Sequence, residues 1–390
     1  MITIIKNVDV YSPEPLGKKQ VVILSEKFEG IYDEVSIPED FIDINVIDGS
    51  GKIMFPGFID SHVHLIGGGG EGGFTTRTLE IKFTDLTTAG ITTVVGCLGT
   101  DNVCRSMASL IAKTRALTEE GISAYCYTGS YEIPVKTVTE SIKRDMMLID
   151  KIIGVGEIAL SDHRSSQPTY EQFVNTVAQA RTGGLLSGKG GIVNVHLGGG
   201  ARKLDMLFSL VENTEIPASQ LLPTHINRST ELFNMGIDYI KKGGFIDLTT
   251  SSNPDFLEPG ELRASEGLER IYKMNLPVNQ VTFSSDGNGS MPVFNEKREL
   301  IGLGVCSVKS LYGEVKNAIL NYEVPMEEAI KVITSNVADL LKLDNKGRIK
   351  KYNDADFVLV DKDSLDITDV CARGRMLIKD NKILVKGTFE

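Results

Sequence analysis

Four of the five histidines in the chain have the spacing expected of metal ligands. His62 and His64 are two residues apart in FPGFIDSHVHL, so on a β-strand both side chains leave the same face and can bind one ion. His196 and His225 each lie in a later apolar run. A single histidine of this kind is more often structural, but imidazole is also the commonest metal-binding side chain. The four together therefore predict a metal centre.

Two carboxylates fit the same centre. Asp286 ends the run VTFSSDG, and Glu157 lies inside the apolar run of GVGEIALSDHR, residues 154–164. An isolated buried carboxylate is costly to desolvate, so it is normally paired or bound to a metal. Four histidines and an aspartate exceed the needs of one tetrahedral site, so we expect two divalent ions bridged by Glu157. In the alternative, the strand begins after Glu157 and leaves it in a solvated turn.

Eight short, β-branched apolar runs would position these residues. They begin near residues 53, 91, 122, 152, 191, 221, 245 and 281, and helix-compatible segments separate most of them. Alternating strands and helices predict a parallel sheet, either doubly wound or closed into a TIM-like (β/α)8 barrel. The barrel is favoured, because the candidate polar residues cluster at the carboxyl ends of the runs, which converge on one mouth in that fold.

The segments around these runs suggest the rest of the architecture. YEQFVNTVAQARTGG and LFNMGIDYIKKGG predict helices that end at their glycines. Residues 1–53 and 347–390 show short alternating strands, and we expect them to form one small β domain. Residues 54–346 would then be the metal-dependent catalytic barrel.

Composition narrows the class of protein. The 390 residues are 41% hydrophobic and carry a net charge of −11, which argues against nucleic acid or an anionic membrane as a partner. No apolar run reaches the length of a membrane span and no secretory core is evident, so a cytoplasmic location is expected. The cysteines are odd in number and scattered, which favours reduced, mostly structural thiols over a nucleophile or disulfides. They are Cys97, Cys104, Cys126, Cys306 and Cys371.

One segment is strongly biased in composition, the glycine-rich GGGGEGG at residues 67–73. A phosphate-binding loop is one interpretation, but the segment lacks the GK[ST] signature. A loop that lets substrate approach the backbone closely is favoured.

Several motifs together resemble the bacterial isoaspartyl (β-aspartyl) dipeptidases of the amidohydrolase superfamily. FPGFIDSHVHL is similar to the first-strand signature of the superfamily. The more specific blocks extend nearly from end to end of the chain, in the order HVHLIGGGGEGG, TTRT, CLGTD, AKTRALTEEGISA, DHRS, LLPTHINR, SSDGNGS and VKGTFE. The resemblance implies a metal-dependent barrel with a small β domain, hydrolysis of the isopeptide bond of β-aspartyl dipeptides, and a homo-oligomer.

The resemblance also implies roles for the metal ligands. His62 and His64 would hold the more buried ion, and His196 and His225 the other. Asp286 would complete the first site and act as general base and acid. Zinc is the expected ion, although ligands of this kind also accept manganese and cobalt. The expected nucleophile is a metal-bound hydroxide.

Glu157 departs from the pattern of many relatives, which bridge the metals with a carbamylated lysine. Glutamate is shorter, so its backbone must approach the ions more closely. Gly154, Gly156 and an apparent one-residue insertion before the site would allow that approach. We therefore expect a glutamate-bridged centre that needs no carbon dioxide.

Substrate recognition is implied in the same way. A β-aspartyl dipeptide carries one free ammonium and two free carboxylates, so its pocket needs both charges. Glu71 would take the ammonium, arginines suit the carboxylates, and Tyr131 would stabilise the oxyanion. Asp162 and His163 receive no catalytic role. The expected substrate-binding residues are Glu71, Thr100, Tyr131, Arg164, Arg228 and Ser290.

Two other functions remain open on the same barrel. One is another amidohydrolase activity, such as a cyclic amidase or an N-acyl amino acid deacylase, with the same metal centre. The other is a binding protein without activity. Glu71 and the two arginines favour the dipeptidase over the first, and the intact histidine set favours an enzyme over the second.

Overall fold

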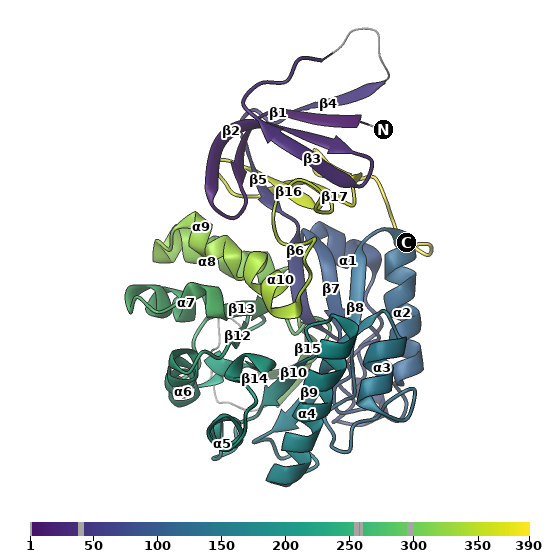
Figure 1. Cartoon of the computed structure of the whole chain (residues 1–390), viewed down its shortest axis with the longest axis vertical. Coiled ribbons are helices and arrows are strands. Elements are labelled where there is room, and N and C mark those ends of the chain that lie inside the picture. Colours follow the sequence, from purple (N-terminus) through teal and green to yellow (C-terminus); the bar gives the residue numbers. More distant parts are fainter. Residues whose placement is uncertain (1, 38–42, 253–256, 258–259, 295–299) are drawn as a thin grey trace.

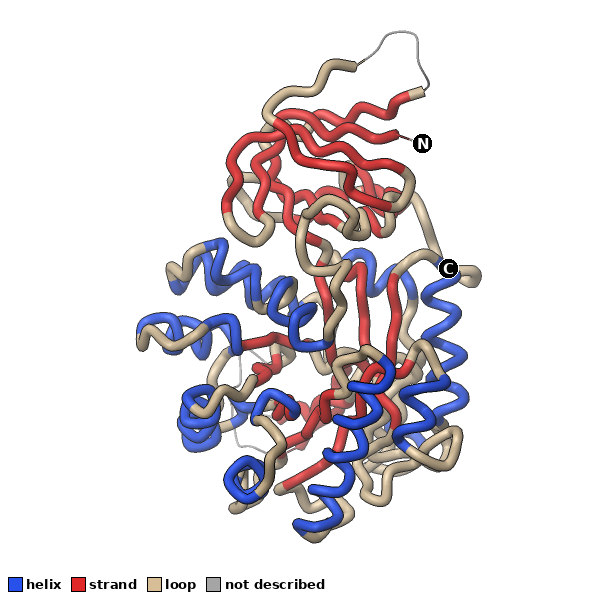
Figure 2. Tube along the Cα trace, viewed as in Figure 1, coloured by secondary structure: helices blue, strands red, loops and turns tan. Residues whose placement is uncertain are grey.

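The computed structural model describes residues 2–37, 43–252, 257, 260–294 and 300–390. A strand-rich layer built from both ends of the chain sits against a larger body in which helices surround parallel strands (Figure 1). Figure 2 shows the same division, with the strands of the larger body enclosed by helices.

Eight parallel strands form the larger body in the described part of the chain. Six of them pair in sequence order, and the last two pair with each other. Every residue of the first six except Tyr125 is buried, as expected of barrel strands covered by helices. The strands are β6 (Phe58–Val63), β7 (Ile91–Gly96), β8 (Ser123–Thr128), β9 (Ile152–Leu160), β10 (Ile192–Leu197), β11 (Leu221–Thr224), β12 (Ile246–Thr249) and β13 (Val281–Ser284).

Hydrogen bonds connect the two groups of strands into a barrel. At one seam, Val63 of β6 pairs in parallel with Gly287 just after β13, and the His64 amide donates to the Gly287 carbonyl at 2.8 Å. At the other seam, the Thr224 hydroxyl of β11 donates to Asp247 of β12 at 2.7 Å. The predicted (β/α)8 barrel is therefore confirmed, and all eight apolar runs are strands in it.

Helices cover the barrel, and local sequence explains where several of them begin. The Ser106 side chain accepts a hydrogen bond from the Ser109 amide, and Thr169 with Gln172 forms a capping box. The helices are α1 (Phe83–Thr88), α2 (Met107–Glu120), α3 (Ile142–Leu148), α4 (Tyr170–Ser187), α5 (Asp205–Asn213), α6 (Thr230–Lys241), α7 (Ala264–Lys273), α8 (Ser310–Tyr322), α9 (Met326–Lys331) and α10 (Ser335–Leu341). None of the helices in the described ranges is both long and apolar enough to span a bilayer.

The prediction that α4 ends at its first glycines is wrong. The helix continues through Gly183 and Gly184 to Ser187, and Gly188 caps it with a φ of +67°. A Cβ on Gly184 would lie 2.8 Å from the Cα of Gly191, so this glycine permits close packing of α4 on the start of β10 rather than ending the helix. The prediction for α6 is confirmed, because that helix ends at Lys241, before the glycine pair.

The chain ends form a nine-stranded sheet. Its order is β19-β18-β17-β16-β5-β1-β2-β3, with β4 on β1. This is the expected small β domain; its bounds at 1–53 and 347–390 stay a prediction. Buried Lys346 binds Asp356 at 2.6 Å and the Ser123 hydroxyl at 2.7 Å, which connects this layer to the amino end of β8. The strands are β1 (Ile2–Tyr11), β2 (Pro15–Leu24), β3 (Lys27–Tyr32), β4 (Ile44–Asp48), β5 (Lys52–Pro56), β16 (Phe357–Asp361), β17 (Ile367–Ala372), β18 (Arg375–Lys379) and β19 (Lys382–Ile383).

An antiparallel hairpin follows β13 at the barrel mouth. It consists of β14 (Ser290–Phe294) and β15 (Leu300–Val305). The Asn288 amide precedes it and bonds to the Cys306 carbonyl at 2.8 Å, so the hairpin closes on the strand end that carries Asp286.

Strand β9 has a bulge at Gly156 and Glu157. Val155 pairs with Val193 and Ile158 with Val195, so Gly156 and Glu157 together face the single residue Asn194. Gly156 has a φ of +153°, and a Cβ there would lie 2.9 Å from the Asn194 Cβ. The extra residue and the glycine therefore provide the local irregularity expected around Glu157.

Replacement of Gly156 by alanine is expected to destabilise the protein by about 1–3 kcal/mol, since the new methyl group overlaps Asn194 and the backbone angle disfavours a side chain. Urea unfolding would measure the loss. Gly313→Ala is the control, because Gly313 lies within α8 and a Cβ there meets nothing within 4 Å. Equal stability of the two variants would show that the bulge tolerates a side chain.

Candidate metal centre and substrate site

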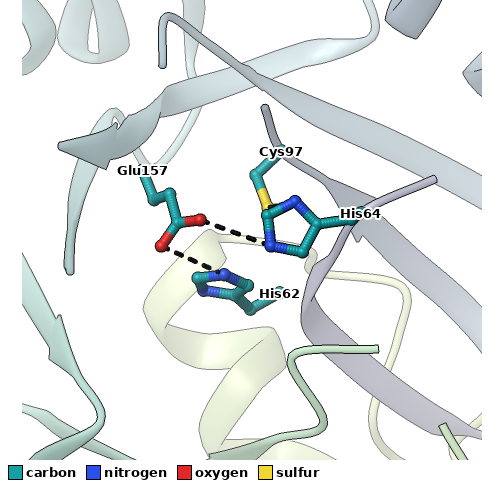
Figure 3. Close-up of side chains that lie close together, drawn as sticks. All are labelled: His62, His64, Cys97 and Glu157. Atoms are coloured by element: carbon teal, nitrogen blue, oxygen red, sulfur yellow. Dashed lines mark hydrogen bonds and ion pairs between the residues drawn. The ribbon is translucent and has the colours of Figure 1, made fainter. Parts of the chain in front are cut away.

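Glu157 lies at the centre of a cluster of imidazoles at the carboxyl end of the barrel. Its side chain is 1% exposed, and its two oxygens face different histidines. Figure 3 shows Oε1 directed at His64 and Oε2 at His62, at 3.4 and 3.3 Å from their Nε2 atoms. Oε2 also lies 3.1 Å from His196 Nδ1 and 3.9 Å from His225 Nε2. Glu157 is therefore buried, and the solvated-turn alternative is wrong.

The donor atoms form two groups that share Glu157. Within each group the ligand atoms lie within 4.8 Å of one another. The first group comprises His62, His64, Cys97 and Glu157, and the second comprises Glu157, His196 and His225. Asp286 borders the first group, with Oδ1 3.1 Å from His64 Nε2 and 3.6 Å from His62 Nε2.

The bonding of His62 supports a metal role. Its side chain is 0% exposed, and neither ring nitrogen has a hydrogen-bond partner among the described residues. Buried polar atoms are nearly always satisfied, so a buried ring without an aligned hydrogen bond, whose Nε2 faces carboxylate oxygens at 3.3 and 3.6 Å, indicates a ligand position. The residues present therefore fit a divalent metal.

Polar neighbours orient the second pair of histidines. His225 Nδ1 lies 2.7 Å from the Thr249 hydroxyl, which directs Nε2 toward Glu157. His196 Nε2 lies 3.0 Å from Asp162. Such outer contacts set the tautomer and the ring plane of a metal-binding histidine. Asp162, left without a role by the sequence, thus contacts a candidate ligand directly.

The backbone also shapes the site. His225 has a φ of +63° and Asp286 a φ of +51°, so both occupy the left-handed region that non-glycine residues seldom adopt. Each residue lies directly after a barrel strand or within two residues of one, where the chain turns away from the mouth. This turn directs the two side chains back toward the cluster.

The cluster keeps its carboxylates ionised. Burial alone would raise the pKa of Glu157, but the rings of His62 and His196 hold that pKa well below its usual value. Burial likewise opposes ionisation of Asp286, and the hydrogen bond from His64 outweighs it, so the pKa of Asp286 is lowered. Burial raises the pKa of Tyr131 well above its usual value, and nearby Glu157 adds to this, so the phenol keeps its proton.

A second set of charges lies beside the metal ligands. Glu71 Oε1 accepts hydrogen bonds from the Thr100 hydroxyl at 2.7 Å and from Arg164 Nη1 at 3.3 Å. Arg164 also binds Asp162 with two nitrogens, at 3.0 and 2.8 Å, which lowers the pKa of Asp162. Burial opposes that shift, and hydrogen bonds from His196 and Arg164 outweigh it. One chain of contacts thus runs from the glycine loop to the metal ligands.

The remaining predicted site residues have different surroundings. The Tyr131 hydroxyl lies 3.0 Å from His196 Nδ1, and the Arg164 guanidinium lies over the Tyr131 ring. Arg228 Nη1 donates to the Leu197 carbonyl at the end of β10. A Cβ on Gly69 would lie 3.0 Å from the Ser290 Cβ, so Ser290 borders the glycine loop. His163 has a side chain that is 90% exposed and does not join the histidine cluster.

Comparison with known proteins agrees with this geometry. Residues 53–385 match the amidohydrolase family model. The chain belongs to the amidohydrolase family.

Solved structures place this amidohydrolase among more specific relatives. It is 46% identical to a β-aspartyl dipeptidase from the thermophilic, keratin-degrading Fervidobacterium islandicum AW-1, solved in complex with the β-Asp-Leu dipeptide. The superposition has a TM-score of 0.92 and covers 98% of this chain and 97% of that one. The resemblance to β-aspartyl dipeptidases is therefore confirmed.

More distant relatives show the breadth of the fold. A dihydropyrimidinase from Brevibacillus agri NCHU1002 superimposes with a TM-score of 0.68 over 99% of this chain and 97% of that one, at 16% identity. A dihydroorotase from Halalkalibacterium halodurans is 28% identical over 163 residues, which is 42% of this chain and only 35% of that protein. The dihydropyrimidinase match shows the fold alone, and neither match says anything of the substrate of this amidohydrolase.

The sequence did not single out Cys97 as a site residue. It was grouped with the structural thiols, yet its sulfur joins the first donor group. The available signal was its position, because Cys97 directly follows β7, the strand beside the one that carries His62 and His64.

Replacement of Glu157 by alanine is expected to lower metal affinity more than about 100-fold, because it removes the one donor common to both groups. Elemental analysis after dialysis against a metal buffer would measure this. Glu171→Ala, on the exposed side of α4, is the control and should retain metal. Unchanged metal content in Glu157→Ala would place any bound ion elsewhere.

Proposed function

We propose that this amidohydrolase hydrolyses the isopeptide bond of β-aspartyl dipeptides. The observation that carries the proposal is the Glu71–Arg164 pair, which places an anion and a cation together beside the metal ligands. A β-aspartyl dipeptide presents an ammonium and carboxylates, so it needs both charges. The relative from Fervidobacterium islandicum, solved with β-Asp-Leu, supports the same substrate class.

The metal centre would hold two divalent ions, expected to be zinc. His62, His64 and Asp286 would hold one, His196 and His225 the other, and Glu157 would bridge them. Such ions would supply an activated water nucleophile and polarise the scissile carbonyl. Imidazole and carboxylate ligands suit zinc, and Glu157 already faces both histidine pairs without a carbamylated lysine.

Two residues at the centre would transfer the proton and stabilise the negative charge that forms during hydrolysis. Asp286, held as a carboxylate, accepts the proton of the attacking water and returns it to the leaving amine. Tyr131 keeps its phenolic proton, so its hydroxyl donates a hydrogen bond to the carbonyl oxygen of the scissile bond as that oxygen gains negative charge. Both groups lie against the histidine cluster, with Asp286 on His64 and Tyr131 on His196.

Substrate charges would be divided among the outer residues. Glu71, oriented by Thr100, binds the α-ammonium. Arg164 and Arg228 bind carboxylates, and Ser290 adds a hydroxyl beside the glycine loop. A cavity of about 300 Å³ adjoins this group, and its lining includes Gly69, Gly70, Glu71, Thr100 and Asp101.

The thiols, the exposed apolar residues and the net charge bear on the location, assembly and partners of the protein. All five cysteines are unpaired, which supports a reducing, cytoplasmic setting. Phe74, Leu79 and Val103 are each more than 80% exposed, and apolar surface of this kind supports assembly into a homo-oligomer. The acidic charge of the chain supports a small-molecule substrate rather than a nucleic acid or a membrane.

The decisive experiment compares β-Asp-Leu with α-Asp-Leu as substrates of the purified protein. We expect rapid release of leucine from the β-linked dipeptide only, loss of activity with a chelator, and recovery when zinc is added. A hydantoin and an N-acetyl amino acid test the other amidohydrolase activities. Hydrolysis of either in preference to β-Asp-Leu would overturn the dipeptidase assignment, and no activity on any of them would favour a binding protein.

Glu71→Gln tests how the ammonium is recognised. The amide keeps the size of the side chain but removes its charge, so kcat/KM on β-Asp-Leu should fall by about 10–100-fold, the value of a hydrogen bond between charged groups. The matched control is N-acetyl-β-Asp-Leu, which lacks the ammonium. The variant and the wild type should hydrolyse that substrate at similar rates, and an equal loss on both substrates would mean that Glu71 does not bind the ammonium.

A further inference from the structure

Cys97 is a buried thiol set among candidate metal ligands. It directly follows β7, and its side chain is 0% exposed. Its sulfur lies 3.9 Å from His64 Nδ1 and 3.7 Å from the Val63 carbonyl. Figure 3 shows the Cys97 side chain extending toward the His64 ring.

We propose that Cys97 is a further, thiolate ligand of the ion that His62, His64 and Asp286 would hold beside the bridging Glu157. The inference rests on the proposed metal centre and extends it, because it turns a site of nitrogen and oxygen donors into one that also has sulfur. Binding is an exchange: the S–H bond breaks, the proton leaves to solvent, and a sulfur–metal bond forms.

The geometry supports direct ligation. The four donor atoms lie within 4.8 Å of one another. Donor atoms at about 2.0–2.3 Å from one zinc ion are roughly 3.3–3.8 Å apart in a tetrahedral site, so modest movement of the four side chains would bring their donors to one ion, with Asp286 Oδ1, 3.1 Å from His64 Nε2, beside them. His62 provides a separate indication, since this fully buried ring has no aligned hydrogen bond among the described residues and its Nε2 faces the Glu157 and Asp286 carboxylates at 3.3 and 3.6 Å.

Two of the other three buried cysteines have apolar surroundings. Cys126 lies in the main apolar core and Cys371 in the core of the terminal sheet. One flank of Cys97 also packs in an apolar cluster with Val95 and Tyr127, but the other faces two imidazoles and a carboxylate. A purely structural thiol has no need of those neighbours.

A sulfur ligand would change which metals the site prefers. Thiolate is a soft donor that suits zinc and cobalt, whereas manganese and magnesium prefer oxygen ligands. The first ion should therefore be harder to replace by manganese than an ion held only by imidazole and carboxylate. Cys97 would thus act as a selectivity-determining ligand.

Cobalt substitution of the holoenzyme tests this directly. Thiolate–cobalt(II) bonds absorb in the near ultraviolet by charge transfer, whereas imidazole and carboxylate bonds do not. Wild type should show this band, Cys97→Ala and Cys97→Ser should lose it, and the equally buried control Cys126→Ala should keep it. Zinc affinity should also fall at least about tenfold in Cys97→Ala, with a smaller fall for manganese.

The outcomes separate this inference from the proposed function. If wild type binds cobalt and hydrolyses β-Asp-Leu without showing the band, Cys97 is not a ligand and the dipeptidase proposal stands. A band that persists in Cys97→Ala also overturns the assignment. If wild type binds neither cobalt nor zinc, both proposals fail. If the Cys97 variants do not fold, the presence or absence of the band in the wild-type spectrum decides the assignment.

Discussion

The burial of one carboxylate among four imidazoles is the constraint on which the site depends. Glu157 is 1% exposed, so it stays ionised only because positive or metal-binding groups surround it. Those groups come from β6 and its carboxyl end on one side of the barrel and from the neighbouring strands β10 and β11 on the other. A single strand could not supply them, so the closed ring of parallel strands is needed to bring the donors together around one side chain.

The backbone of β9 follows from the same constraint. A glutamate reaches less far than a modified lysine, so its Cα must lie nearer the ions. Strand β9 has a two-to-one bulge against Asn194 at this residue, and the bulge needs a glycine at 156 because that φ disfavours side chains and the space is filled. The irregularity interrupts the hydrogen-bond ladder of an otherwise regular strand at one position, and the candidate ligand Glu157 lies at that position.

Much of this arrangement could be predicted from sequence, since it is encoded locally. Eight buried β-branched runs that alternate with helices are compatible with few folds, and the His62–His64 spacing places both side chains on one face of one strand. Contacts between strands were harder to predict. The role of Cys97 depends on which strand lies beside β6, and the binding of Arg164 by Asp162 depends on side-chain direction after β9. The end of α4 was missed because Gly184 serves tertiary packing, which overrides the usual preference for glycine at a helix end.

Glu71 and Arg164 form an ion pair in the outer site, and this arrangement favours a ligand that carries both a positive and a negative charge. In this structure each partner satisfies the other, and Asp162 holds the guanidinium in place through two further hydrogen bonds. A molecule with only one charge that displaced this contact would leave either the carboxylate or the guanidinium without its partner, at an electrostatic cost. A molecule with both an ammonium and a carboxylate can separate the pair and replace each half. Because Arg164 also lies 3.3 Å from His196, this exchange would take place against a candidate metal ligand, so charges that recognise the proposed substrate would also place its scissile bond next to the proposed metal centre.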